Sequence, residues 1–294
     1  MKEIPESKKG IIIKCLGGLY TVESPYGIYE CKARGVFRNR GVCLYVGDSV
    51  EFSDGVITNV LKRKNSIIRP PLANLDQLVF VVSTCSPSPN LLLLDKFIAI
   101  AEYKGIKPII VITKIDLGDW SNIEKIYGSI GIRVLKADYS DEASIEAVRE
   151  QLKGKISAFT GNSGAGKSTL LNAVDPSLNI PTAEISKKLG RGRHTTRHAE
   201  LYKLSDGGYI ADTPGFSTFE TNKYDIIRKE ELAGCFSEFR EFTGNCRFKD
   251  CSHICEKGCA VIEALNDGKI FESRHASYCN MYEEAKQIKE WELK

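Results

Sequence analysis

The sequence predicts a chain of three parts: an N-terminal β-barrel of the oligonucleotide-binding (OB) type, a central α/β domain, and a mainly helical C-terminal domain. Three observations predict it: short strand-like segments before residue 70, strands alternating with helices from residue 76 onward, and cysteines clustered near residue 250. With 294 residues, 42% of them hydrophobic, the chain can form several cores. We expect domains at residues 1–68, 69–222 and 223–294.

The first part contains short alternating segments separated by glycine and aspartate, a pattern typical of a small closed barrel. The segments are Gly10 to Lys14, Leu19 to Val22, Gly27 to Ala33, Cys43 to Tyr45 and Ser49 to Phe52.

Positive charge is concentrated in this part. Residues 1–70 hold 12 Lys and Arg against 7 Asp and Glu, a balance of +5, whereas the whole chain carries +3. Charges at Lys32, Arg34, Arg38, Arg40 and in Lys62-Arg63-Lys64 lie beside aromatic residues that can stack on bases, namely Tyr20, Tyr26, Tyr29 and Phe37. We interpret the barrel as an RNA-binding surface. The alternative is that these charges only keep a small barrel soluble.

The central part alternates strands with helices, which predicts a largely parallel sheet. Expected strands are Leu78 to Ser83, Ile109 to Thr113, Ile132 to Leu135, Ile156 to Phe159 and Gly208 to Ala211. Expected helices are Leu91 to Tyr103, a helix near Glu124, and Glu142 to Leu152.

Residues 161–168 read GNSGAGKS, which matches the phosphate-binding pattern G-x-x-x-x-G-K-[ST] directly after a predicted strand. In such a loop the backbone N–H groups and the start of the next helix attract phosphates. Lys167 would reach the outer phosphates, where it has a catalytic role, and Ser168 would bind Mg²⁺. The expected nucleotide contacts here are Gly161, Asn162, Ser163, Gly164, Ala165, Gly166, Lys167, Ser168 and Thr169.

The tetrapeptide Thr113-Lys114-Ile115-Asp116 ends another predicted strand and fits a guanine-reading motif. The Asp116 carboxylate can accept hydrogen bonds from guanine N1–H and the exocyclic amine, whereas adenine has an acceptor at N1. The mismatch would leave a charged group unpaired, at a cost of ~1–3 kcal/mol. Thr113, Lys114, Ile115 and Asp116 therefore predict a preference for GTP and GDP.

The segment Asp212-Thr213-Pro214-Gly215 supplies a third nucleotide-binding element. Asp212 would hold Mg²⁺, and the Gly215 N–H would contact the terminal phosphate. The basic segment 190–197, GRGRHTTR, would be a second switch, with Thr196 or Thr195 completing the Mg²⁺ shell. Its alternative is a plain basic surface loop.

The order of these motifs predicts a circularly permuted GTPase. The guanine motif precedes the phosphate loop, whereas GTPases usually have it afterwards. Joining the usual chain ends and reopening the domain after Gly215 produces the observed order, and nearby termini make that tolerable.

The C-terminal part contains Cys246-x4-Cys251-x-His253-x5-Cys259. Four of the chain's ten cysteines lie in these fourteen positions. Three thiolates and one imidazole suit a structural, tetrahedral Zn²⁺ site. Cys255 lies between these residues and could replace one of them as the fourth ligand. The alternative interpretation is that the cysteines form disulfides.

Together these features resemble the bacterial small-subunit-dependent GTPases of the RsgA (YjeQ) family. The resemblance rests on the basic barrel, the permuted GTPase motifs, the GRGRHTT segment and the cysteine cluster, and covers nearly the whole chain. It implies a factor that binds the small ribosomal subunit and its rRNA during late assembly, with GTP hydrolysis stimulated by the subunit.

The residue after Gly215 is Phe216, which cannot position water as the glutamine of many GTPases does. We therefore expect slow intrinsic hydrolysis, with help from His194, which resembles the family's histidine at that place, or from the subunit. The alternative to a catalytic role is that His194 is an ordinary surface histidine. Two other functions stay open: an RNA-binding factor that uses GTP only as a structural ligand, and a GTPase acting on another RNA such as tRNA.

No apolar run reaches the ~18 residues needed to cross a bilayer. From this and the absence of a signal peptide we expect a cytoplasmic protein without membrane contact. We also expect a monomer.

Overall fold

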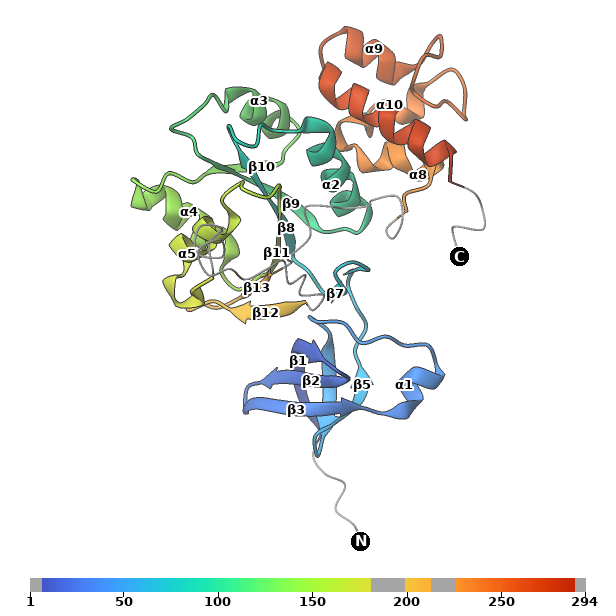
Figure 1. The fold of residues 1–294 in the computed structure, drawn as a ribbon. Helices are drawn as coiled ribbons and strands as arrows, with labels where there is room; N and C mark the ends of the chain where they lie inside the picture. The colour runs from blue at the N-terminus through green and yellow to red at the C-terminus, as the bar shows by residue number, and fades with distance from the viewer. Residues whose placement is uncertain (1–6, 181–198, 213–225, 289–294) are drawn as a thin grey trace.

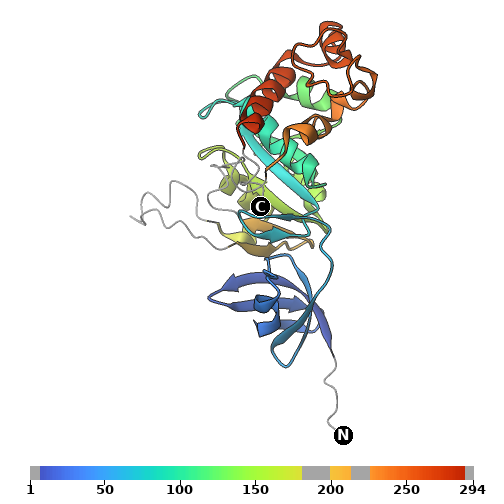
Figure 2. The same cartoon turned by 90° about the vertical axis from the view of Figure 1, so that its right-hand side faces the viewer.

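The computed structural model describes residues 7–180, 199–212 and 226–288, with only the backbone for Arg38 and Asp212. The chain forms three bodies in a row. The barrel and the C-terminal helices lie at opposite ends of the central α/β domain (Figures 1 and 2).

The N-terminal body is a closed five-stranded barrel. Its strands are β1 (Lys8–Leu16), β2 (Leu19–Ser24), β3 (Gly27–Ala33), β4 (Ser49–Ser53) and β5 (Val56–Val60). They run in the order β1-β2-β3-β5-β4, and β4 pairs with β1 to close the barrel. Inward residues such as Ile12, Val22 and Ile57 are fully buried, as alternation along the strands requires. The expected barrel is confirmed.

One expected strand, Cys43 to Tyr45, does not form. The segment follows the short helix α1 (Gly35–Asn39) as a loop. Here the Asp48 carboxylate accepts the Tyr45 N–H at 2.7 Å, and the Arg63 guanidinium donates to the Cys43 carbonyl at 2.5 Å. Side chains therefore satisfy backbone groups that a strand would have paired, and residue alternation alone could not reveal this.

The central body contains a six-stranded sheet in the order β10-β9-β8-β11-β13-β12. Its strands are β8 (Gln77–Ser83), β9 (Lys107–Thr113), β10 (Arg133–Lys136), β11 (Ile156–Thr160), β12 (Glu200–Lys203) and β13 (Tyr209–Asp212). All neighbours are parallel except β12 and β13. The carboxyl ends of β8, β9, β10 and β11 therefore meet at one edge.

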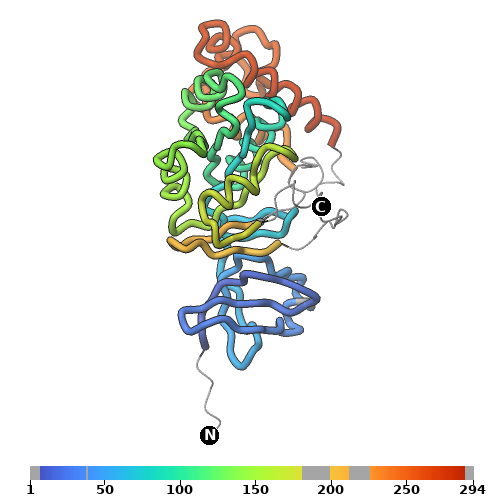
Figure 3. The backbone as a smooth tube through the Cα atoms, turned by 60° about the vertical axis from the view of Figure 1, so that its left-hand side comes forward, coloured from blue at the N-terminus to red at the C-terminus, as the bar shows by residue number. Residues whose placement is uncertain are grey.

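Helices cover both faces of this sheet (Figure 3). Two apolar clusters show that α2 (Leu91–Tyr103) and α3 (Ser121–Ser129) cover one face, whereas α4 (Glu142–Leu152) and α5 (Lys167–Val174) cover the other. Strands β8 and β9 contribute to both clusters, because alternate residues point to opposite faces. This explains their continuous apolar sequences.

The barrel joins the sheet through strand β12 and through the linker, and Lys203 of β12 also pairs with Glu23 of β2. Strand β1 pairs with β12 at Lys14 and Glu200, whose side chains also form an ion pair of 2.9 Å. The linker forms a small hairpin of β6 (Ser66–Ile67) and β7 (Leu72–Ala73).

The C-terminal body is mainly helical, as expected. It contains α8 (Lys229–Leu232), α9 (Ala260–Asn266), α10 (Glu272–Lys286) and short 3₁₀ turns η2 (Ala233–Cys235), η3 (Ser237–Phe239) and η4 (Thr243–Asn245). Helix α10 packs against α2 of the central body, where Arg274 forms a buried 2.7 Å ion pair with Asp95. None of the helices in the described residues is long and apolar enough to cross a membrane.

Candidate nucleotide site and metal centre

The glycine-rich loop connects the carboxyl end of β11 to the first residue of α5. Gly166, immediately before α5, has a φ of 87°, a left-handed conformation that favours glycine. Gly161 has a φ of 141°, and a Cβ there would lie 2.2 Å from the Val81 carbonyl oxygen of β8. The loop therefore turns sharply against the neighbouring strand, which only glycine permits.

The Lys167 side chain reaches across this loop. Its Nζ donates to the carbonyl oxygens of Gly161 at 2.5 Å and of Asn162 at 3.0 Å. The ammonium group thus lies inside the turn formed by residues 161–166, beside the start of α5. Both features attract an anion.

The guanine-type motif and the glycine-rich loop are in direct contact. Thr113 at the end of β9 is buried, and its Oγ1 donates to the Ala165 carbonyl oxygen at 2.6 Å. Segments 52 residues apart in sequence therefore form one site. The threonine hydroxyl braces the loop where many GTPases use an asparagine amide.

Lys114 and Asp116 follow at the same sheet edge. Lys114 has a φ of 54°, and its Nζ donates to the Ser86 carbonyl oxygen at 2.6 Å. The Thr84 Oγ1 hydroxyl donates to the Lys114 carbonyl oxygen at 2.5 Å. These bonds tie the motif to the segment after β8. Asp116 is exposed, so its carboxylate is accessible to a base.

Several predicted residues cannot be placed at this site. His194, Thr195, Thr196, Gly215 and Phe216 lie outside the described residues. The backbone of Asp212 ends β13, next to β11, so this strand end shares the edge with the loop.

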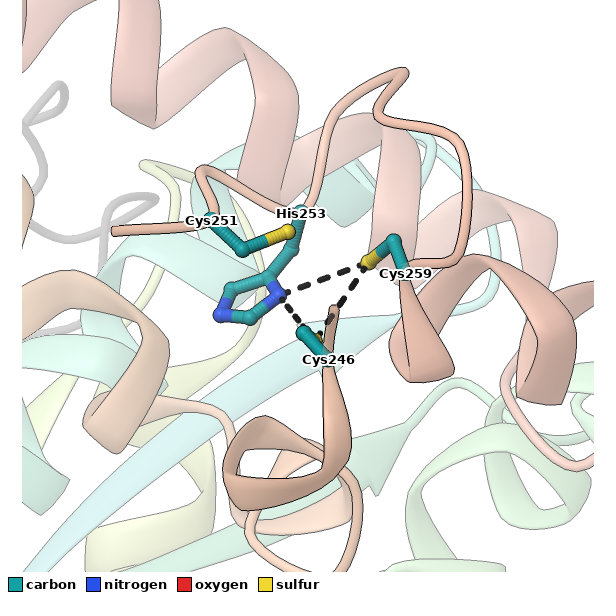
Figure 4. A group of neighbouring side chains, drawn as sticks. All are labelled: Cys246, Cys251, His253 and Cys259. Atoms are coloured by element: carbon teal, nitrogen blue, oxygen red, sulfur yellow. Dashed lines mark hydrogen bonds between the residues drawn. The ribbon is translucent and has the colours of Figure 1, made fainter. Parts of the chain in front are cut away.

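The cysteine and histidine side chains of the C-terminal body converge (Figure 4). The ligand atoms of Cys246, Cys251, His253 and Cys259 all lie within 4.8 Å of one another. His253 Nδ1 is 3.5 Å from the sulfur atoms of both Cys246 and Cys259. Cys255 is exposed and is not part of this group. Three soft sulfur donors and one imidazole match the donor set of structural zinc sites.

Burial disfavours the charged forms of the side chains in this cluster. It raises the pKa of Cys251 to about 12 and lowers the pKa of His253 below its usual range. Thiolates crowded together without a cation are therefore unfavourable. A bound Zn²⁺ would favour the deprotonated ligands, and its binding energy would contribute to folding.

The loop carrying His253 is held by neighbouring side chains. The Glu256 carboxylate accepts the backbone N–H groups of Ser252 and Ile254 at 2.8 and 3.0 Å. Helix α10 adds His275, whose Nε2 is 2.7 Å from the His253 carbonyl oxygen, and Tyr278, whose hydroxyl donates to the Ser252 carbonyl oxygen at 2.8 Å. Sequence spacing predicted that these four side chains come together, but it did not predict the side chains that hold the loop.

A groove of about 910 Å³ lies between the β1–β2 turn, the end of β3 and the segment that contains α1. The predicted RNA contacts Tyr20, Lys32, Arg34 and Phe37 all line it. Arg63 does not: its guanidinium pairs with the fully buried Asp48 at 2.6 Å and lies 4.1 Å from the Tyr45 ring. This charge therefore also holds the barrel together, and RNA contact by the stretch Lys62-Arg63-Lys64 stays a prediction.

A phosphate loop braced by a guanine-type motif that precedes it in sequence defines a circularly permuted GTPase. The comparisons agree: the family described as RsgA N-terminal domain matches residues 9–59, and RsgA GTPase matches residues 60–222. The chain belongs to the RsgA family and is a GTPase that binds guanine nucleotides.

Related proteins are similar along their whole length. The small ribosomal subunit biogenesis GTPase RsgA of Halalkalibacterium halodurans is 41% identical, covering 95% of this chain and 97% of that protein. Its Geobacillus counterpart is 43% identical, covering 96% and 98%. The crystal structure of YjeQ from Thermotoga maritima has a TM-score of 0.83 and 37% identity, covering 97% of this chain and 100% of that one. YloQ, described as a circularly permuted GTPase, has a TM-score of 0.79 and 33% identity, covering 98% of both chains.

Proposed function

We propose that this GTPase binds the small ribosomal subunit and assists its late assembly, and that the subunit stimulates GTP hydrolysis. The observation that carries the proposal is similarity over nearly the whole chain to proteins named for small-subunit biogenesis. Function would require all three bodies: residues 1–68 for RNA contact, 69–222 for GTP, and 223–294 for zinc.

The nucleotide would bind at the edge where β9 and β11 end. Residues 161–169 would surround the phosphates with backbone N–H groups, and Lys167 would neutralise the charge that develops on the outer phosphates. Asp116 would pair with the guanine N1–H and amine. Ser168, Asp212 and Thr196 would hold Mg²⁺, which would supply positive charge to neutralise the phosphates.

The three cysteines of the cluster and His253 would hold one structural Zn²⁺. Cys251→Ser, which removes a proposed ligand, should lower the zinc content well below one ion per chain. The matched variant Cys255→Ser should keep it, since Cys255 is exposed and outside the cluster. Metal analysis of the purified proteins checks this assignment, and zinc loss in Cys255→Ser would refute it.

RNA would contact both ends of the molecule. At one end is the barrel groove with Lys32 and Arg34. At the other, Arg247 lies 5.5 Å from the ring of the exposed Phe248, beside the exposed Lys249. Two modest contacts on one particle reinforce each other through effective concentration. A change in the relative position of the two ends during the GTPase cycle would therefore change affinity for the subunit.

Phosphate release measured with and without purified small subunits tests this function. Wild type should hydrolyse GTP slowly alone and at least about tenfold faster with small subunits, since groups supplied in trans can add ~10³–10⁵-fold. Lys167→Ala should be slow in both conditions. Lys107→Ala, which removes an exposed lysine at the amino end of β9, is the control for loss of one positive charge.

The outcomes separate the competing functions. Hydrolysis in neither condition would favour an RNA-binding protein that uses GTP only as a ligand. Equal stimulation by tRNA or by large subunits, at a stated salt concentration, would contradict a specific small-subunit role, because phosphate contacts alone bind any RNA weakly. The cytoplasm, where subunits assemble, is the proposed location.

A further inference from the structure

Guanine has two polar edges. One carries N1–H and the amine, which the proposed site assigns to Asp116. The other carries the acceptors O6 and N7. In a site that excludes water, these acceptors need donors, because an unpaired buried polar group is costly.

Thr113 cannot supply that donor. Its hydroxyl has one proton, which it donates to the Ala165 carbonyl oxygen at 2.6 Å. An asparagine at this position would have two amide protons, one for the loop and one for the base. The hydroxyl therefore braces the loop but leaves the second edge of guanine without a side-chain donor from residue 113.

Tyr139 lies at the same place. It follows β10, at the edge where β9 and β11 also end. A Cβ on Gly166 would lie 3.7 Å from Thr113 Oγ1 and 3.8 Å from the Tyr139 hydroxyl. Both hydroxyls therefore face the same side of the phosphate loop, although their residues come from different strand ends.

The Tyr139 hydroxyl is available as a donor. Among the described residues it makes no hydrogen bond, whereas the adjacent backbone donors are used: Asp138 N–H bonds Ser144 Oγ at 2.7 Å and Ser140 N–H bonds Asp138 Oδ1 at 2.9 Å. Partial burial raises the pKa of Tyr139 to about 12, so the hydroxyl keeps its proton at neutral pH. The residue is 46% exposed.

We propose that Tyr139 is a specificity-determining residue whose hydroxyl donates a hydrogen bond to N7 of the guanine base. Of the two acceptors, N7 is farther than O6 from the edge that Asp116 would bind. N7 would therefore lie on the side of Thr113 and the phosphate loop. The inference rests on the proposed nucleotide site and adds to it: the base is read from both edges, by a carboxylate on one side and by a phenol on the other.

Binding of GDP and of 7-deaza-GDP to wild type and Tyr139→Phe, measured by calorimetry, tests this. In 7-deaza-GDP a C–H group replaces N7, and the Asp116 edge is unchanged. Wild type should bind GDP about three- to tenfold more tightly than 7-deaza-GDP, the effect of one hydrogen bond. Tyr139→Phe should bind both with the lower affinity. Tyr103→Phe, at an exposed position at the end of α2, should behave as wild type.

The assignment would be overturned if Tyr139→Phe weakened the binding of GDP and of 7-deaza-GDP by the same factor. It would also be overturned if the variant preferred GDP over 7-deaza-GDP as strongly as wild type does. Lys167→Ala separates this failure from that of the site itself. If Lys167→Ala weakens GDP binding while Tyr139→Phe changes nothing, only the role of Tyr139 is wrong. If Lys167→Ala binds GDP as wild type does, the proposed nucleotide site is wrong.

Discussion

Single residues at the nucleotide site are constrained by backbone geometry as much as by chemistry. Gly161 is required because its Cβ position is occupied by the Val81 carbonyl oxygen, and Gly166 because of its left-handed conformation. The sequence pattern predicted both glycines from the needs of a phosphate. The close approach to β8 is a second reason for Gly161, and it depends on a strand 80 residues earlier that no local pattern reveals.

Gly161→Ala should lower the free energy of unfolding by about 3 kcal/mol or more and abolish GDP binding, because backbone must move to relieve a 2.2 Å contact. Gly154→Ala is the matched control. Gly154 also has a positive φ, 68°, but a Cβ there meets nothing within 4 Å, so about 1 kcal/mol is expected. Urea unfolding compares the two, and equal losses would contradict the proposed contact.

Asp175 links the end of α5 to the β12–β13 turn. Although burial acts to raise its pKa, hydrogen bonds from Ser177 and Ser205 lower it from 3.8 to about 2. A lowered pKa stabilises the fold above pH 3.8, by about 2 kcal/mol, and this contribution is lost as the pH falls towards 2.

Asp175→Asn should therefore be less stable than wild type at pH 7, and the difference should fall to about half at pH 3. Urea unfolding at several pH values measures it. The exposed Asp206, in the same turn, provides Asp206→Asn as the control for loss of one negative charge. A difference that does not change with pH would show that the hydrogen bonds do not depend on the carboxylate charge.

At the scale of elements, long periodic segments were predictable and irregular ones were not. Helices Leu91–Tyr103 and Glu142–Leu152 have the predicted bounds, because each has a side-chain cap, Asn90 or Asp141, and a continuous buried face. The loop at Cys43 to Tyr45 was mistaken for a strand because its alternation resembles one. Tyr139 was missed because its motif is ordinary, although its place after β10 assigns it to the ligand edge.

The contact of α10 with α2 is another feature that sequence did not predict. Arg274, 1% exposed, pairs with Asp95 and with Glu238, both at 2.7 Å, and the Tyr127 hydroxyl donates to Asp95 at 2.8 Å. This network connects the C-terminal body to helices α2 and α3 of the GTPase domain. Its members are up to 179 residues apart, so no local pattern indicates the pairing.

Arg274→Met should cost about 3–5 kcal/mol of unfolding free energy, since it leaves buried carboxylates without a partner. Lys286→Met, on the same helix but in an exposed ion pair with Glu283, should cost under about 0.5 kcal/mol. Urea unfolding of the metal-loaded proteins compares them. Similar small costs would mean that the network does not fix the two bodies together.

For the whole molecule, the permuted order has a consequence along the chain. Reopening the GTPase domain after the predicted phosphate contact at Gly215 makes the C-terminal body the next part of the sequence. The barrel is attached at the opposite end through β1 and β12. The sequence predicted the three bodies from composition and motifs, but not how they contact one another, because those contacts are made by residues with no motif.

The measurement that tests the central claim most directly is phosphate release by Asp116→Asn from XTP and GTP, with and without small subunits. Xanthine has a carbonyl where guanine has its amine, so an amide at residue 116 can pair with xanthine. We predict that the variant loses GTP hydrolysis and hydrolyses XTP with subunit stimulation like that of wild type on GTP. Unchanged GTP hydrolysis by the variant would show that Asp116 and the Lys167 loop do not share one nucleotide, and would contradict the account.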